Sequence, residues 1–279
     1  MKIWAHTLVK NEEKYLWYAV TSVVDHVDKV LLWDTGSTDR TLEICRELSN
    51  KFPEKIDFRQ VKISSADEFP KLRNKMLRAT EADWFLMVDG DEVWWEGSMK
   101  KVIGTISKKG KRIESIVVPM IYPIGDIYHR QEEAAGKYEL AGKKGHYALR
   151  GINRSIPGLT SLNPHGTWGW TDGEGRMIQD RSSEKLLFID APYMHFSHLP
   201  RAGTIEDEKK VIKRPQKIKH ELGNPLPKDF YYPEVFFRER PKFVPSPWNR
   251  MTPAFYLRAF LETPLRKIKR RVLKGKVGY

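Results

Sequence analysis

Short apolar segments alternate with amphipathic segments along the first 92 residues, and this alternation restricts the fold more than any other feature of the chain. Four segments read as strands because they are dense in apolar and β-branched residues: 3–9, 27–33, 56–61 and 84–88. Between them, apolar residues recur every three or four positions, as on the buried side of a helix. The pattern predicts an α/β fold, a mainly parallel sheet with helices on both faces.

Polar residues follow the ends of three of these predicted strands. Asn11, Asp34 and Asp89 each come directly after an apolar run. Ligands of parallel α/β sheets bind beyond the carboxyl ends of the strands. We therefore expect these three side chains to converge on one crevice.

The acidic motif Asp89-Gly90-Asp91 follows the apolar segment 84–88. Turns of this composition are common on protein surfaces, but here the preceding strand would fix both carboxylates. Gly90 allows a sharp turn, and hard divalent cations prefer oxygen ligands. Such a cation can neutralise the diphosphate that leaves a nucleotide sugar. Asp91 is the expected metal ligand, Asp89 the ligand of metal-linked water or ribose, and Glu92 an added ligand or a loop support.

Four segments together resemble family 2 glycosyltransferases of the GT-A fold. They are residues 8–13 (LVKNEE), residues 34–41 (DTGSTDRT), Arg73-Asn74, and residues 89–92 (DGDE). Their order and spacing match the family over about the first third of the chain. The resemblance implies a Rossmann-like nucleotide-diphospho-sugar transferase fold.

The resemblance also implies roles for single residues on the donor side. Leu8, Val9, Lys10 and Asn11 would line the nucleotide-sugar site, with residues 8–10 as the floor under base and ribose. Asp34 would accept a hydrogen bond from the base, which favours a UDP-sugar. Arg73 would reach the diphosphate, and Asp89 with Gly90 would contact the donor. Asp89 and Asp91 would hold the metal, Mn²⁺ or Mg²⁺.

The second half supplies candidates for the remaining functions. In related enzymes a histidine completes the metal site, and His195 follows a predicted strand at 193–196 more closely than His198 does. The family reaction usually inverts the sugar, which requires a general base on the acceptor hydroxyl. Many relatives carry a His-Glu pair there, whereas this chain has His165-Gly166. Asp172, Glu174 and His165 remain the candidates for the base.

The domain organisation follows from these assignments. Residues 1–200 are expected to form the GT-A catalytic domain, with 1–95 binding the nucleotide sugar and 96–200 the acceptor. Residues 201–279 are expected to form a helical and Pro-rich extension, with a charged helix at 204–219, an extended segment at 225–253 and a basic tail.

Charge and cysteine content bear on partners and compartment. The net charge is +13, and residues 264–279 contain seven Lys or Arg and no acidic residue. Residues 257–276 form an amphipathic, basic segment that Pro264 is expected to kink; it fits either peripheral contact with an anionic membrane or a solvated helix. One cysteine, Cys45, and the lack of a leader-like or spanning apolar run favour the cytoplasm, with a peripheral position on the inner face of the membrane as an option.

These observations predict a metal-dependent glycosyltransferase of the hexosyltransferase type, with a carbohydrate or glycolipid acceptor. A nucleotidyltransferase on a similar sheet is the first alternative, but residues 3–13 lack the glycine that its phosphate loop needs. A non-catalytic polyanion-binding protein is the second. No nucleic-acid motif supports it, and we expect no nucleic-acid partner.

Overall fold

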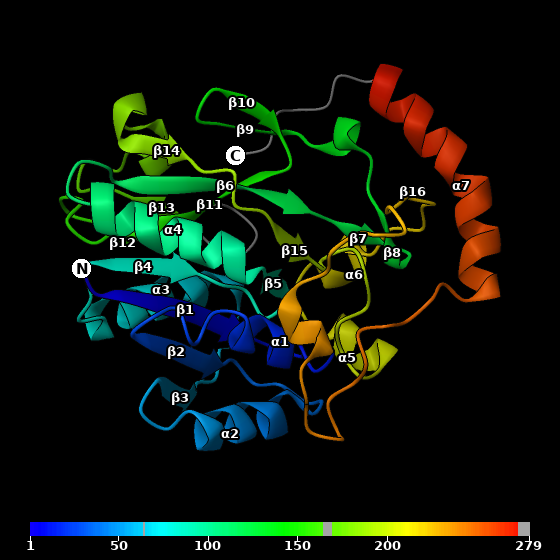
Figure 1. The fold of residues 1–279 in the computed structure, drawn as a ribbon, viewed down its shortest axis with the longest axis horizontal. Helices are drawn as coiled ribbons and strands as arrows, with labels where there is room; N and C mark the ends of the chain where they lie inside the picture. Colours follow the sequence, from blue (N-terminus) through cyan, green and yellow to red (C-terminus); the bar gives the residue numbers. More distant parts are fainter. Residues whose placement is uncertain (64, 164–168, 273–279) are drawn as a thin grey trace.

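The computed structural model describes residues 1–63, 65–163 and 169–272. Within that part of the chain, a nine-stranded sheet forms the centre of the molecule (Figure 1). Eight strands follow one another in the order β3 (Ile56–Gln60), β2 (Lys29–Asp34), β1 (Ile3–Val9), β4 (Trp84–Met87), β11 (Tyr147–Asn153), β6 (Ser115–Ile121), β15 (Tyr193–His195) and β5 (Glu92–Trp94), and β14 (Leu186–Phe188) pairs with β6.

The sheet is parallel in its first half and mixed in its second. β3, β2, β1 and β4 are parallel, with Val9 of β1 opposite Asp34 of β2. β11 runs antiparallel to β4 on one side and β6 on the other, which joins residues after 110 to the same sheet. The carboxyl ends of β1, β2 and β4 therefore meet at one edge, as the alternation in the sequence predicts.

Four helices cover the two faces of the sheet: α1 (Leu16–Thr21), α2 (Thr41–Lys51), α3 (Phe69–Ala79) and α4 (Glu96–Lys109). Successive side chains of a strand point to opposite faces. Accordingly Ile3 and Ala5 pack in the cluster that contains buried residues of α1, α2 and α4. Trp4 packs instead with Leu72 and Met76 of α3. The result is an α/β layered fold with its core on both sides of the sheet (Figure 1).

Short elements surround the second half of the sheet. One small sheet contains β7 (Pro123–Ile124), β8 (Asp126–Arg130) and β16 (Asn224–Pro225). Two strand pairs are β9 (Tyr138–Leu140) with β10 (Lys143–Gly145), and β12 (Thr160–Ser161) with β13 (Trp170–Thr171). Short 3₁₀ helices are η1 (Ala66–Glu68), η2 (Glu133–Ala135), η3 (Ile178–Asp180), η4 (Ser183–Lys185) and η5 (Glu234–Phe237).

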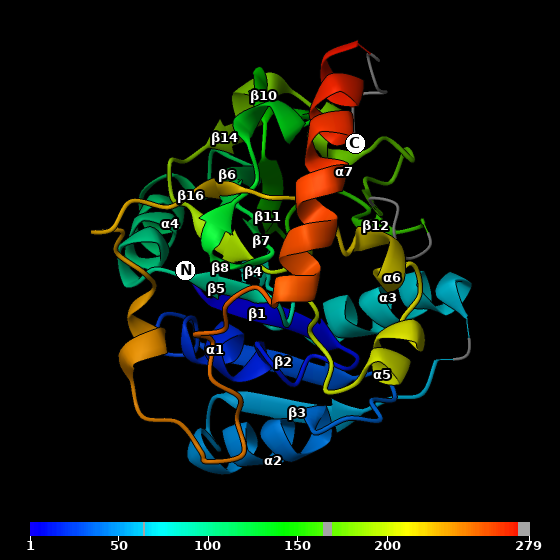
Figure 2. The same ribbon diagram turned by 90° about the vertical axis from the view of Figure 1, so that its right-hand side faces the viewer.

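The C-terminal part contains short helices, an extended wrap and one long helix. α5 (Ile205–Lys209) and α6 (Arg214–Lys217) lie near the carboxyl edge of the sheet, while residues 226–252 wrap the body largely without regular structure (Figure 2). This wrap is anchored because Val235, Phe236 and Val244 are buried in the main core. α7 (Pro253–Val272) lies along the outside of the molecule.

Three local features differ from the sequence-based expectation. α4 was not predicted, although Met99, Val102 and Ile106 provide its buried row. The single helix predicted at 204–219 is wrong, because the chain leaves the helix after Lys209 and Lys213 adopts a positive φ of 58° before α6. The strand β5 was not predicted either, whereas Pro264 lies inside α7 and the kink expected there stays a prediction.

Candidate active site

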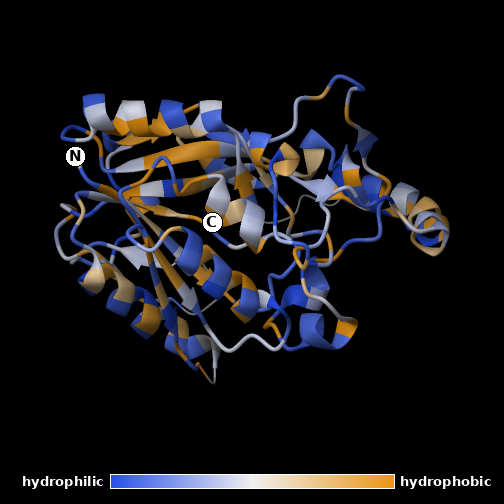
Figure 3. Cartoon of the chain, turned by 60° about the horizontal axis from the view of Figure 1, so that its bottom comes forward, coloured by the Kyte–Doolittle hydropathy of each residue, from blue (hydrophilic) through white to orange (hydrophobic). Residues whose placement is uncertain are grey.

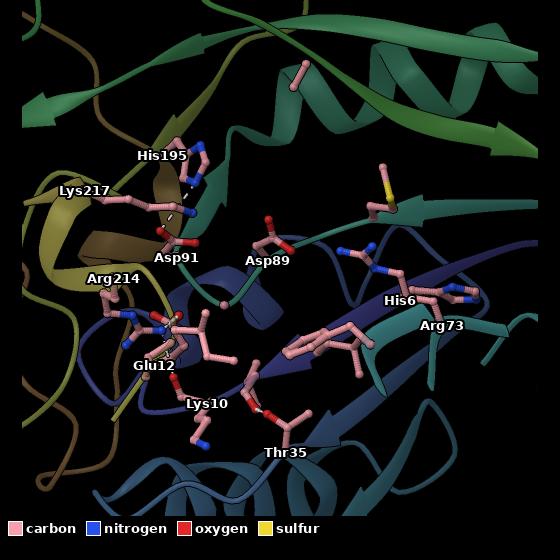
Figure 4. A pocket seen from close by; sticks show the side chains of 18 of the residues that line it. His6, Lys10, Glu12, Thr35, Arg73, Asp89, Asp91, His195, Arg214 and Lys217 are labelled. Atoms are coloured by element: carbon pink, nitrogen blue, oxygen red, sulfur yellow. Dashed lines mark hydrogen bonds and ion pairs between the residues drawn. The ribbon is translucent and has the colours of Figure 1, made fainter. Parts of the chain in front are cut away.

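A cavity of about 930 Å³ opens at the carboxyl edge of the sheet (Figure 4). β1 and the residue after it contribute Leu8, Val9 and Lys10, and Thr35 follows β2. Both halves of the chain supply the rest of the wall, including the charged side chains Glu12, Arg73, Asp89, Asp91, Arg150, Asp180, Arg201, Lys210, Arg214 and Lys217. The cavity thus combines carboxylates with many cationic groups.

The acidic loop after β4 packs closely on two side chains at Gly90. A Cβ atom on Gly90 would lie 2.9 Å from Cγ of Glu12 and 3.0 Å from Cγ1 of Val9. The loop is tied to β15, because the backbone N–H of Phe196 donates to the carbonyl of Asp91 at 2.9 Å. These contacts bring the acidic residues next to His195 from a strand about a hundred residues later.

Asp89, Glu92 and His195 form a cluster with the composition of a metal site. Each offers a ligand atom, and these atoms lie within 4.8 Å of one another. Nδ1 of His195 is buried, has no hydrogen-bond partner among the described residues, and lies 3.8 Å from Oε1 of Glu92. Two carboxylates and one imidazole suit a divalent cation such as Mn²⁺ or Mg²⁺, so the residues present fit the implied metal.

Arg150 of β11 balances the acidic cluster. Its guanidinium contacts the carboxylate of Glu92 and lies 3.6 Å from Asp89. Burial raises the pKa of Glu92 to about 7, against the opposing effect of Arg150. Because the carboxylates repel each other when both are ionised, positive charge at this point stabilises the cluster.

Asp91 is directed toward a different partner than Asp89. Its carboxylate is buried, 2.5 Å from Nη1 of Arg201 and 3.4 Å from Nε2 of His195. Burial alone would raise the pKa of Asp91, but Arg201 and His195 outweigh it and hold that pKa well below its usual range. Asp91 therefore borders the cluster while its charge is already paired.

Four cations on the cavity wall come from the segment at 201–217, which the sequence did not mark as functional. Arg214 contacts Glu12 and donates to the carbonyl of Lys10 at 2.8 Å. Lys217 extends toward the region of Asp91 and His195 in Figure 4. Burial and the nearby Arg201 lower the pKa of Lys217. A dense run of Lys and Arg around residues 209–219 was the only signal in the sequence for this cationic wall.

Asp34 and Asn11 shape the donor side without lining the cavity. The Asp34 carboxylate is buried and accepts hydrogen bonds from the backbone of Gly36 at 2.9 Å and Ser37 at 3.1 Å. Asn11, with φ 53°, accepts from the backbone N–H of Thr38 at 2.7 Å. Both side chains fix the turn after β2, and Thr35 from that turn reaches the cavity.

Arg73 and Asn74 of α3 connect the cavity to the second half of the chain. Arg73 lines the cavity, and burial lowers its pKa while Asp89 opposes that change. The amide of Asn74 accepts from Ser161 N–H at 2.8 Å and donates to Ser161 carbonyl at 2.9 Å. This pair of bonds holds β12 against α3.

The residues predicted as the general base lie in different places. Asp172 is buried in an ion pair with Arg181 and accepts from two backbone N–H groups, and Glu174 is exposed beside Arg176. Neither is among the residues that line the cavity. His165 lies outside the described residues. Asp180, at the end of η3, does line the cavity, although no sequence pattern singles it out.

His198 packs near the metal-type cluster without joining it. Its ring stacks on Tyr122 at a centroid distance of 4.8 Å, and Nδ1 is 3.0 Å from the carbonyl of Lys217. Burial lowers the pKa of His198 well below its usual value. Tyr122 also stacks on His195 at 5.0 Å, so this tyrosine orients both rings.

The sequence profile described as "Glycosyl transferase family 2" matches residues 6–168, which is more than half of the chain. The chain belongs to glycosyl transferase family 2. Membership confirms the resemblance and the glycosyltransferase class, and the observed mixed sheet with helices on both faces confirms the predicted α/β fold class. It favours a glycosyltransferase over a nucleotidyltransferase or a non-catalytic polyanion-binding protein.

The curated relatives of this glycosyltransferase are similar to it over only part of their own length. The glycosyltransferase SunS of Bacillus subtilis is 27% identical over 162 residues, which are 54% of this chain and 35% of SunS. A TPR repeat-containing protein of Synechococcus elongatus is 35% identical over 85 residues, 30% of this chain and 19% of that protein. The chain therefore spans about a third or less of these relatives.

Solved structures give remote matches to this family member. S. aureus TarS 1–349 in complex with UDP-GlcNAc has a TM-score of 0.47 at 16% identity, covering 70% of this chain and 58% of that one. Mycobacterium tuberculosis glucosyl-3-phosphoglycerate synthase with Mn²⁺ and UDP-glucose has a TM-score of 0.45 at 15% identity, covering 74% and 73%.

Proposed function

We propose that this protein transfers a hexose from a nucleotide-diphosphate sugar, with UDP as the nucleotide, to an acceptor hydroxyl in a metal-dependent, inverting reaction. One observation carries the proposal: Asp89 and His195 of the metal-type cluster line the same cavity as several cations, at the carboxyl edge of the sheet. A diphosphate needs both kinds of group, since it carries negative charge and gains more when it leaves.

The donor would lie across the ends of β1 and β2. Leu8 and Val9 offer an apolar floor, and Lys10 a nearby charge. The family resemblance implies that Asp34 contacts the base; its carboxylate also binds its own turn. We therefore propose that Asp34 fixes the turn and that Thr35 completes the contact with the nucleotide.

Asp89, Glu92 and His195 would hold the divalent cation, with Asp91 next to them. When bound, the cation neutralises the charge that builds up on the leaving diphosphate. Lys217, Lys210 and Arg73 would then contact the phosphate oxygens from other directions. Arg201 positions Asp91 through their buried ion pair.

We propose Asp180 as the general base, alongside the earlier candidates Asp172, Glu174 and His165. A base must reach the proton of the acceptor hydroxyl, so it must face the cavity. Asp180 lines the cavity, and no ion pair engages its carboxylate among the described residues. The Asp172 carboxylate is occupied by Arg181 and by backbone amides.

The acceptor is proposed to be a carbohydrate or a glycolipid, and the site of action the cytoplasm. None of the helices in the part of the chain that the structure describes is both long and apolar enough to cross a bilayer. Cys45 is buried and is the single cysteine of the sequence. A glycolipid acceptor would require the enzyme to reach a membrane surface.

Donor binding tests the proposal directly. We expect UDP to bind with Mn²⁺ more tightly than without it, and UDP-sugars to raise the melting temperature more than GDP- or CMP-sugars. Asp89→Asn should weaken Mn²⁺-dependent UDP binding at least tenfold, measured by calorimetry, because one ligand charge is lost. Glu174→Gln is the matched control, since Glu174 is exposed and does not line the cavity. Equal UDP affinity for Asp89→Asn and the native protein would refute the proposed metal site.

A further inference from the structure

The outer side of α7 exposes a continuous row of apolar side chains. Their exposed fractions are 64% for Leu257, 65% for Leu261, 69% for Leu265, 57% for Ile268 and 72% for Val272. Because they recur every three or four residues, they form one stripe along the helix. Contiguous exposed apolar surface of this kind marks an interaction site.

The inner side of the same helix is held to the body by polar contacts. Thr263 is buried and accepts a hydrogen bond from the backbone N–H of Leu222 at 2.7 Å. Arg270 pairs with Glu132 at 2.9 Å and with Glu221. These contacts fix the rotation of α7, and they direct its apolar stripe away from the protein core. A surface helix of a globular protein has the opposite arrangement.

Cations flank the stripe on both sides. At 100° per residue, Lys267 and Arg271 lie on one side of the stripe, and Arg258 and Lys269 lie on the other. Among the described residues, Lys267 and Lys269 have no ion pair within 4 Å, and Arg271 approaches only Glu132 at 4.0 Å. Glu262, the one acidic residue of α7, is paired with Arg258 and Arg266. The surface is therefore apolar along its centre and positive along its edges.

We propose that α7 lies in the plane of an anionic lipid bilayer, with its apolar stripe between the headgroups and the flanking cations at the lipid phosphates. The acyl chains of a bilayer would contact the apolar stripe, and the phosphates of anionic lipids would contact the cations beside it. A second copy of the chain would cover the stripe, but it would bring the cations of the two helices close together. Charge complementarity therefore favours the membrane. This docking surface lies outside the proposed active site, so it does not depend on the proposed function.

Figures 2 and 3 show that the geometry leaves room for this contact. α7 lies at the periphery of the molecule, and apolar and polar residues alternate around it where it is seen nearly end-on at the edge of Figure 3.

Co-sedimentation of the full chain with vesicles tests the proposal. We expect the native protein to bind vesicles of phosphatidylcholine with phosphatidylglycerol at least tenfold more tightly than phosphatidylcholine alone. Leu261→Glu with Leu265→Glu should reduce binding to the anionic vesicles more than tenfold. Lys267→Gln with Lys269→Gln should reduce it roughly tenfold or more, because each cation near an anionic surface contributes to binding.

A matched control places the same charges elsewhere. Tyr231→Glu with Phe237→Glu alters two equally exposed apolar residues outside α7, at 64% and 66% exposure, and should bind vesicles as the native protein does. Equal loss in this control and in the α7 variant would overturn the proposal. Failure of the native protein to bind the vesicles would also overturn the proposal. If it instead formed a concentration-dependent dimer, and Leu261→Glu with Leu265→Glu dissociated that dimer, the stripe would be covered by a second copy of the chain. UDP binding reports separately that each variant is folded.

Discussion

At the scale of single residues, the site depends on how buried charges are paired. Asp89 and Asp91 are separated by one glycine, yet one belongs to the metal-type cluster and the other is paired with Arg201. β4 ends at Met87, and the backbone N–H of Glu92 donates to the carbonyl of Asp89 at 3.1 Å, so the two aspartates lie in a turn. In a strand, residues two apart would point to the same side, but this turn directs the two carboxylates to different partners. Identical carboxylates thus receive different partners and different chemistry.

Replacement of the cavity-facing carboxylate tests the assignment of the base. We expect Asp180→Asn to lower the turnover of donor hydrolysis at least about 100-fold, the usual contribution of a general base. Donor affinity should change less than threefold, because Asp180 is not in the metal-type cluster. Glu174→Gln is the control and should retain turnover. If Glu174→Gln, and not Asp180→Asn, removed activity, the base would be Glu174.

At the scale of secondary-structure elements, α6 and the residues between α5 and α6 complete the cavity that the sheet begins. Their segment is fastened by Arg214, which contacts Glu12 and the carbonyls of Lys10 and Asn11. The break between the two helices is what turns Arg214 inward, since Lys213 adopts a left-handed conformation there. We therefore expect that binding of the nucleotide sugar stabilises this segment, and that loosening of the segment weakens binding of the nucleotide sugar.

Removal of the fastening residue should loosen the segment. We expect Arg214→Met to lower the free energy of unfolding by about 3 kcal/mol, the usual cost of removing one partner from a buried ion pair. Combination with Glu12→Gln should cost less than the sum of the two single changes, because the two residues interact. Arg176→Met, in an exposed pair with Glu174, should change stability by less than about 1 kcal/mol. Urea unfolding provides all four values, and strict additivity would contradict the coupling.

At the scale of the whole molecule, one sheet unites the two halves of the chain. β4 of the first half pairs with β11 of the second, so the cavity has one wall from each. The domain boundary at residue 200 stays a prediction.

The free energy of unfolding is also a property of the whole chain, and it depends on pH through His6, which lies in the middle of β1.

His6 should make the protein less stable in acid. Burial, together with the charge of Arg154, lowers the pKa of His6 from 6.5 to about 3 in the folded state. The unfolded chain therefore takes up a proton that the folded chain does not, between pH 6.5 and about 3. Stability contributed by neutral His6 is complete above pH 6.5 and falls below it, by about 1.4 kcal/mol per pH unit.

Comparison with His6→Gln isolates this effect. Above pH 7 the difference in unfolding free energy between native protein and variant should be constant. Below pH 6 it should shrink steadily, because only the native protein loses the contribution of His6. Chemical denaturation at several pH values measures it, and a constant difference down to pH 4 would contradict the assigned shift.

The sequence by itself determined the strands β1 to β4, the helices α1 to α3, the acidic motif after β4 and the family. These follow from local patterns: the periodicity of apolar residues defines each element, and parallel strands must present their ends at one edge. It did not reveal α4 or β11. In both segments the apolar residues stand among glycines and charged residues, so their periodicity is too weak to indicate a helix or a strand.

Only the tertiary structure decided which charges meet. Asp91 pairs with Arg201, Glu92 with Arg150 and Asp172 with Arg181. Partners more than 50 residues apart, as in the first two pairs, leave no mark on local periodicity. The outward rotation of α7 was likewise decided by Thr263 and Arg270 binding to distant segments. Local patterns set the elements, whereas long-range pairing of buried charges set the chemistry of the site.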